Sequence, residues 1–207
     1  MLFIIIAILL IFHTILFAQK SRSNRTIREI RDQYWKRERQ ANLTPKKDLS
    51  SLDYILIPIK ELPFVDHPES KALENIQKEI FNLSKEPIVN IGNVSNTDLK
   101  LKYGVANLKH LILCDNNYIN LIRLLQEWGL YYYDCQMYSF AQTILEYAIS
   151  CKTDLHKTYI LLAKVYLHTN QAEKIDTLIE TITLLKSLNK EKTIISLKEL
   201  KYTSYIL

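Results

Sequence analysis

Two stretches decide the fold of this chain: residues 125–148, LQEWGLYYYDCQMYSFAQTILEYA, and residues 159–182, YILLAKVYLHTNQAEKIDTLIETI. The second repeats the residue classes of the first 34 positions later, from 125 to 159 onward. A small residue recurs at Gly129 and Ala163, and an aromatic recurs at Tyr132 and Tyr166. An ordinary amphipathic hairpin has no reason to repeat both classes at one offset. The full set is Leu125, Trp128, Gly129, Tyr132, Ala141, Leu145 and Ala148, matched by Tyr159, Leu162, Ala163, Tyr166, Ile175, Ile179 and Ile182.

This period and pattern resemble tetratricopeptide repeats, in which helical hairpins of 34 residues stack into a solenoid. The resemblance covers about residues 122–187, and a closing helix is expected from Lys190 to about Tyr202. It implies an all-α fold that exposes a groove for another protein. Ile175 and Ile182 stand where the family has small residues, so the second helix of that hairpin is expected further from its neighbour. The alternative is a plain helical bundle.

The resemblance also implies which side chains line the groove, because the first helix of each hairpin forms the concave wall. A mixture of apolar, aromatic and basic groups suits an extended peptide with apolar anchors and some acidic character. The expected partner-binding residues are Arg123, Gln126, Leu130, Tyr133, Lys157, Ile160, Lys164 and Leu167.

Composition favours a helical binding protein and offers little for catalysis. The 207 residues are 48% hydrophobic and include only three Gly and five Pro. The three Cys form no CxxC pair, which predicts small buried thiols rather than disulfides or a zinc site. The five His lack metal-ligand spacing, and no glycine-rich phosphate loop is present. We therefore predict no enzyme, no cofactor and no metal site.

The N-terminal residues 2–18, LFIIIAILLIFHTILFA, carry no charge, and Lys20, Arg22 and Arg25 follow at once. This pattern predicts a single-pass transmembrane anchor over residues 1–19, and the flanking charges predict an outside N-terminus and a cytoplasmic C-terminal domain. The layout is similar to bacterial membrane-anchored tetratricopeptide proteins. The alternative is a cleaved signal peptide on an exported or surface-exposed binding module, although a basic segment before the apolar run is missing.

The positive charge of the chain is local. Residues 20–47 contain ten Lys and Arg against three acidic residues, and helical spacing predicts a solvated helix in this arm. Beside a membrane the simplest partner is anionic lipid. Nucleic acid is the competing partner, but no nucleic-acid module follows the arm. The expected membrane-surface residues are Lys20, Arg22, Arg25, Arg28 and Arg31.

Between the arm and the repeats, Pro58 and its neighbours predict an extended strap over residues 48–67, since proline excludes a central strand. Residues 68–115 are expected to form a degenerate helical layer, with helices over 68–85 and 98–113. Asp115, Asn116 and Asn117 are expected to break the chain before the tetratricopeptide-like repeats and capping helix of residues 116–207. No feature of the sequence identifies the partner or the oligomeric state.

Overall fold

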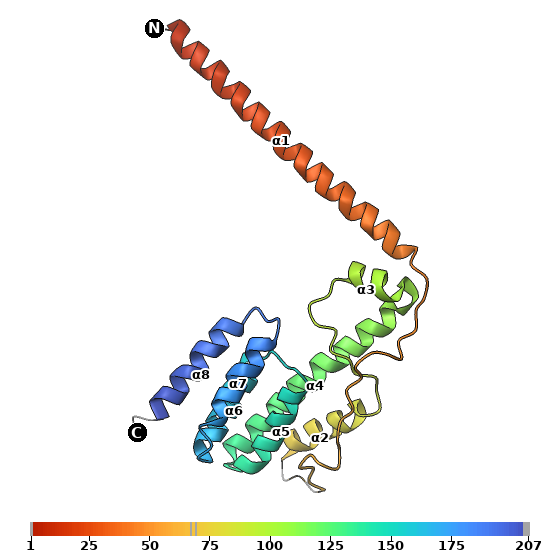
Figure 1. Ribbon diagram of the computed structural model, residues 1–207, viewed down its shortest axis with the longest axis vertical. Coiled ribbons are helices and arrows are strands. Elements are labelled where there is room, and N and C mark those ends of the chain that lie inside the picture. The colour runs from red at the N-terminus through yellow and green to blue at the C-terminus, as the bar shows by residue number, and fades with distance from the viewer. Residues whose placement is uncertain (1, 67, 69, 205–207) are drawn as a thin grey trace. The chain divides into compact units, whose positions relative to one another are not determined.

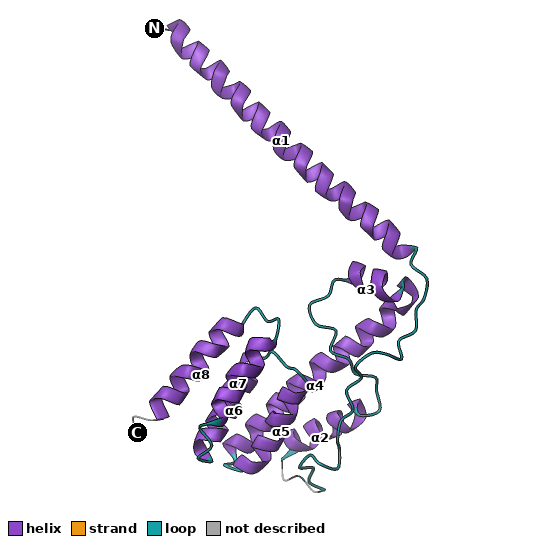
Figure 2. Ribbon diagram, in the orientation of Figure 1, coloured by secondary structure: helices purple, strands orange, loops and turns teal. Residues whose placement is uncertain are grey.

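A computed structural model describes residues 2–66, 68 and 70–204, and the side chains of residues 2–11, 15, 18, 21–23 and 204 are not among those described. The described part is all-helical and contains no strand, as the sequence predicts (Figures 1 and 2). Only an isolated antiparallel bridge between Tyr54 and Val89 has β geometry within it. The helices are α1 (Leu2–Asn42), α2 (Lys71–Leu83), α3 (Asn96–Tyr103), the 3-10 helix η1 (Val105–Asn107), α4 (Leu108–Asp134), α5 (Tyr138–Ser150), α6 (His156–His168), α7 (Lys174–Leu184) and α8 (Lys190–Ser204).

The chain divides into two compact units. The first contains the residues up to Ser50 and Asn93–Lys109, and the second contains Ser51–Gly92 and His110–Leu207. The first unit therefore holds α1, α3 and η1, and the second holds α2, most of α4 and α5–α8.

The predicted membrane localisation is wrong. Among the described residues, no helix is both long enough and apolar enough to span a bilayer. The apolar run of residues 2–18 forms the start of α1. It continues without a break into the charged turns of α1, which runs for 41 residues. The single-pass anchor and the orientation derived from it are therefore not supported.

In the first unit, the end of α1 is held against α3 by a carboxylate. Glu38 accepts hydrogen bonds from Lys100 Nζ and, at 2.7 Å, from Thr97 Oγ1. The hydrogen bond from Lys100, and then that from Thr97, holds the pKa of Glu38 below its ordinary value. Glu38 therefore remains ionised here at neutral pH.

Gly104 allows the chain to turn tightly after α3. Its φ is 91°, a left-handed conformation that side chains rarely adopt, and a Cβ at this position would lie 2.2 Å from the carbonyl oxygen of Pro45. Asn107 fixes the same region, because its Nδ2 donates to the carbonyls of Lys47 and Tyr103, each at 2.7 Å.

Over its described residues 48–66, the predicted strap has no regular structure apart from the bridge at Tyr54. In the second unit, the predicted helix over 68–85 is the shorter α2, which the Ser70 side chain caps. The predicted break at Asp115–Asn117 is wrong, because α4 runs straight through these residues. Asp115 Oδ1 accepts from the backbone N–H of Ile91 at 3.3 Å, and Asn117 Nδ2 donates to Pro87 O at 3.0 Å. These side chains bind the preceding loop instead of capping a helix.

The core of the second unit lies between α4, α5, α6, α7 and α8. Helix α6 packs against α5, α7 and α8, and α7 also packs against α8 (Figure 1). Gly129 of α4 lies directly against α5, since a Cβ here would be 2.6 Å from Leu145 Cδ2. The large side chains buried in this layer include Trp128, Tyr132, Tyr159, Leu125, Ile144, Leu145 and Leu162.

The turns that end α4 and α6 have the same hydrogen-bonded geometry 34 residues apart. Gln136 and Asn170 both have positive φ, at 60° and 56°. The following N–H groups, of Met137 and Gln171, donate back to the carbonyls of Tyr132 and Tyr166 at 2.8 and 2.7 Å. A left-handed residue followed by this long back-bond is the Schellman C-cap. The backbone thus repeats at the same offset as the sequence.

Candidate functional site

The four predicted binding residues of α4 lie on one face of that helix, because they are separated by three and four residues. Leu130 is 40% exposed, and Gln126 and Tyr133 are half-buried. Arg123 is exposed but paired, since its guanidinium lies 2.8 Å from Glu127 Oε1 and 3.7 Å from Glu79 Oε2. Its positive charge is therefore largely neutralised.

The four predicted residues of α6 share a face in the same way. Lys157 and Lys164 are exposed, whereas Ile160 and Leu167 are partly buried and pack against the core. With Arg123 paired, the positive charge of the predicted surface rests on these two lysines.

Tyr133 joins the two faces through an aromatic cluster made of Tyr133, Tyr138 and His168. Tyr133 Oη lies 3.2 Å from His168 Nε2, and the Tyr138 ring stacks on the imidazole with centroids 4.7 Å apart and planes 2° apart. Tyr133 meets both other rings edge-on at 5.7 Å. Burial raises the pKa of Tyr133, so its phenol stays protonated and hydrogen-bonds as a neutral group. Helices α4, α5 and α6 therefore meet at this partly exposed aromatic cluster.

Tyr138 and His168 are absent from the sequence prediction. A signal for His168 existed, because it follows Lys164 by four residues and so falls on the predicted face of α6. Tyr138 opens α5 and offered no such signal, since the groove is expected to be lined by first helices alone. Its role depends on the turn after α4, which places the start of α5 beside the end of α6.

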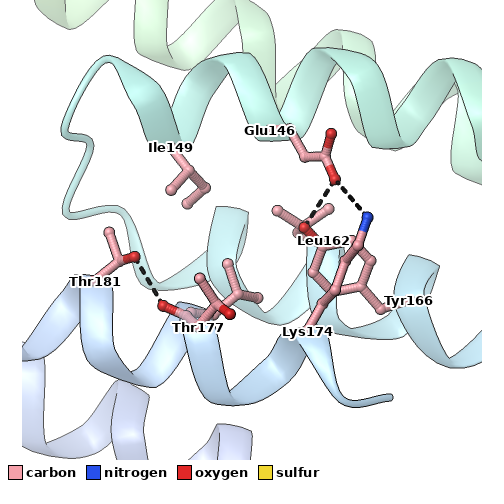
Figure 3. A pocket seen from close by; sticks show the side chains of 8 residues that line it. Glu146, Ile149, Leu162, Tyr166, Lys174, Thr177 and Thr181 are labelled. Atoms are coloured by element: carbon pink, nitrogen blue, oxygen red, sulfur yellow. Dashed lines mark hydrogen bonds and ion pairs between the residues drawn. The ribbon is translucent and has the colours of Figure 1, made fainter. Parts of the chain in front are cut away.

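Sequence analysis also misses a pocket between α5, α6 and α7, which we call the α5–α7 pocket (Figure 3). Its volume is about 280 Å³, and Ile149, Leu162 and Leu178 form its apolar lining. The hydroxyl-bearing Thr177 and Thr181 of α7 line the pocket across from Ile149. A space of this size and lining accepts one apolar side chain rather than a cofactor.

A polar network closes one end of this pocket (Figure 3). Glu146 Oε1 accepts hydrogen bonds from Tyr166 Oη and Gln142 Nε2, each at 2.9 Å, and lies 3.6 Å from Lys174 Nζ. The lysine also lies 5.3 Å from the centre of the Tyr166 ring. Burial, and then the neighbouring Glu146, raises the pKa of Tyr166, which keeps its hydroxyl available as a donor.

The described residues include one exposed cysteine and no cluster that could bind a metal ion. Cys114 and Cys151 are buried, as the sequence predicts, and burial raises the pKa of both thiols. The prediction is wrong for Cys135, which is exposed at the turn after α4. No group of three or more His, Cys, Asp or Glu among the described side chains could hold a metal ion.

The basic residues assigned to a membrane surface lie on α1, in the first unit. Lys20, Arg25, Arg28 and Arg31 are exposed, and the side chain of Arg22 lies outside those described. Arg25 pairs with Glu29 at 3.0 Å. The exposed side chains are compatible with any anionic partner, so they identify none.

Comparison with known protein families, curated proteins and solved structures finds no match to this chain. A functional assignment must therefore rest on the geometry of the described residues.

Proposed function

We propose that this protein is a tetratricopeptide-like α-solenoid scaffold that binds an extended polypeptide along α4 and α6 and has no catalytic role. The observation that carries the proposal is the aromatic cluster. It joins the faces of α4 and α6 on which sequence analysis places all eight binding residues. Partly exposed aromatic side chains on a rigid helical layer are typical anchors for a partner chain.

The repeated turns support the solenoid part of this proposal. Because α4 and α6 end in the same C-cap 34 residues apart, each can be the first helix of one hairpin, with α5 and α7 as the second helices. Helix α8 then packs on α6 as the first helix of the next layer would. In such an arrangement the first helices line the concave wall.

The chemistry of this surface supports a particular kind of partner. Leu130 and Tyr133 offer apolar contact, and Lys157 and Lys164 offer positive charge about two turns apart on α6. We therefore expect a peptide with aliphatic or aromatic anchors separated by acidic residues. The α5–α7 pocket would accept an additional apolar side chain of a longer partner.

Selection from a displayed library of random dodecapeptides, followed by fluorescence polarisation with the best peptide, tests the proposal. The double variant Tyr133→Ala/Lys164→Glu should weaken binding at least about tenfold, because it removes an anchor and reverses a charge. The matched control is Phe81→Ala/Lys78→Glu, which removes an exposed aromatic and reverses a lysine on α2. Equal loss in both variants, or none in the first, would eliminate the α4–α6 surface.

A further inference from the structure

Helix α8 carries apolar side chains on both of its faces. Leu197 is completely buried toward α6 and α7, while Ile195 is 56% exposed on the opposite face. Tyr202 is 70% exposed and borders a surface hollow beside Ile179 of α7. Leu188, in the turn before the helix, is 97% exposed. Ile195 and Tyr202 are seven residues apart on α8 and therefore lie along one line of that helix. Exposed apolar side chains gathered on one helix face mark an interaction surface.

The order of the charged residues beside this line indicates which partner would fit it. At about 100° per residue, Lys192 and Glu199 fall on one side of Ile195, and Glu191 and Lys198 fall on the other. Each side has one positive residue and one negative residue, at nearly equal distances before and after Ile195. All four are exposed.

We propose that a second copy of this chain docks on the exposed face of α8, antiparallel and related by a two-fold axis beside Ile195. A two-fold interface brings the same patch of both copies together. In this arrangement each side of the helix meets the same side of the second copy in reversed order. Lys192 then faces Glu199 of the second copy, and Glu191 faces Lys198 of the second copy.

The apolar line is also compatible with the reversed order. In the reversed order Ile195 meets its own equivalent, and the turn before α8, which contains Leu188, lies at the end of the second copy's α8 that carries Tyr202. The contact is independent of the peptide-binding surface on α4 and α6, and one proposal can fail without the other.

Sedimentation equilibrium of the full chain tests the apolar part of the contact. Ile195→Asp should raise the dimer dissociation constant at least about 100-fold, since two carboxylates would meet in a desolvated contact. Ile119→Asp is the matched control, because Ile119 is 58% exposed on α4. Circular dichroism checks that both variants stay helical. A monomeric parent, or a dimer that Ile195→Asp leaves intact, would overturn the proposal.

A charge swap tests the antiparallel order. Lys192→Glu alone should raise the dissociation constant about tenfold, because the new carboxylate at position 192 would lie beside Glu199 of the second copy. Lys192→Glu/Glu199→Lys should restore association to the parental value, since each new glutamate meets a new lysine of the second copy. In a parallel pair the same swap would place like charges together. Failure of the swap to restore association would therefore refute the antiparallel dimer.

Discussion

Substitution of Gly129 by alanine should destabilise the second unit, although alanine is the better helix former. The new Cβ would lie 2.6 Å from Leu145 Cδ2 and 2.7 Å from Leu145 Cγ, about 1 Å closer than carbon atoms normally pack. Leu145 is completely buried, so it has no free space into which to move. Overpacking of this kind costs about 2 kcal/mol, against about 1 kcal/mol gained in helix propensity. The expected net loss is about 1 kcal/mol.

The sign of the effect should reverse when Leu145 is truncated. In a Leu145→Ala background the clash is gone, so Gly129→Ala should stabilise by about 1 kcal/mol through helix propensity alone. Equilibrium unfolding in urea, followed by the fluorescence of the buried Trp128 with the exposed Trp35 replaced by phenylalanine, measures all four members of the cycle. If Gly129→Ala leaves the Leu145 parent equally stable or more stable, the close contact between α4 and α5 is refuted.

Thr158→Val should stabilise the second unit by about 1 kcal/mol in the same urea assay, because the buried Thr158 hydroxyl has no hydrogen-bond partner among the described residues; a loss of stability would contradict this. Gly104→Ala should destabilise the first unit by at least about 2 kcal/mol, since its φ is 91° and its Cβ would meet the Pro45 backbone, and amide hydrogen exchange in α3 should accelerate. Because its pKa is lowered, ionised Glu38 stabilises the first unit at every pH above its ordinary pKa of 4.5. This contribution to stability is lost as the pH falls through the folded-state pKa. Lys100→Met should raise the pKa of Glu38, measured by carboxyl NMR titration, and an unchanged titration would exclude Lys100 as its main cause.

The helices of the second unit were predictable where apolar spacing and turn chemistry agree. The stripe through Leu125, Trp128 and Tyr132 faces the core, as the pattern indicates. The predicted break at Asp115–Asn117 fails because a polar triplet has two possible uses. Such side chains can cap their own helix or bind a neighbouring loop, and only the fold determines which backbone groups lie within reach.

The candidate site was predictable only in part, for a related reason. Residues on one helical face follow from spacing, so Tyr133 and Lys164 could be assigned to faces from the sequence. The contact of Tyr133 with His168 depends on how α4 packs beside α6, and the stacking of Tyr138 depends on the turn between α4 and α5. Neither distance is encoded in a local pattern. The α5–α7 pocket is similar, because three helices must be placed before it exists.

Because Cys135 is exposed, ligand binding near the aromatic cluster can be followed directly. The other two thiols are buried and have raised pKa values, which slows their reaction with maleimides at neutral pH. A fluorophore can therefore be attached at Cys135 in the otherwise unaltered chain, two residues from Tyr133. Its emission would register the arrival of a ligand there without any engineered attachment point.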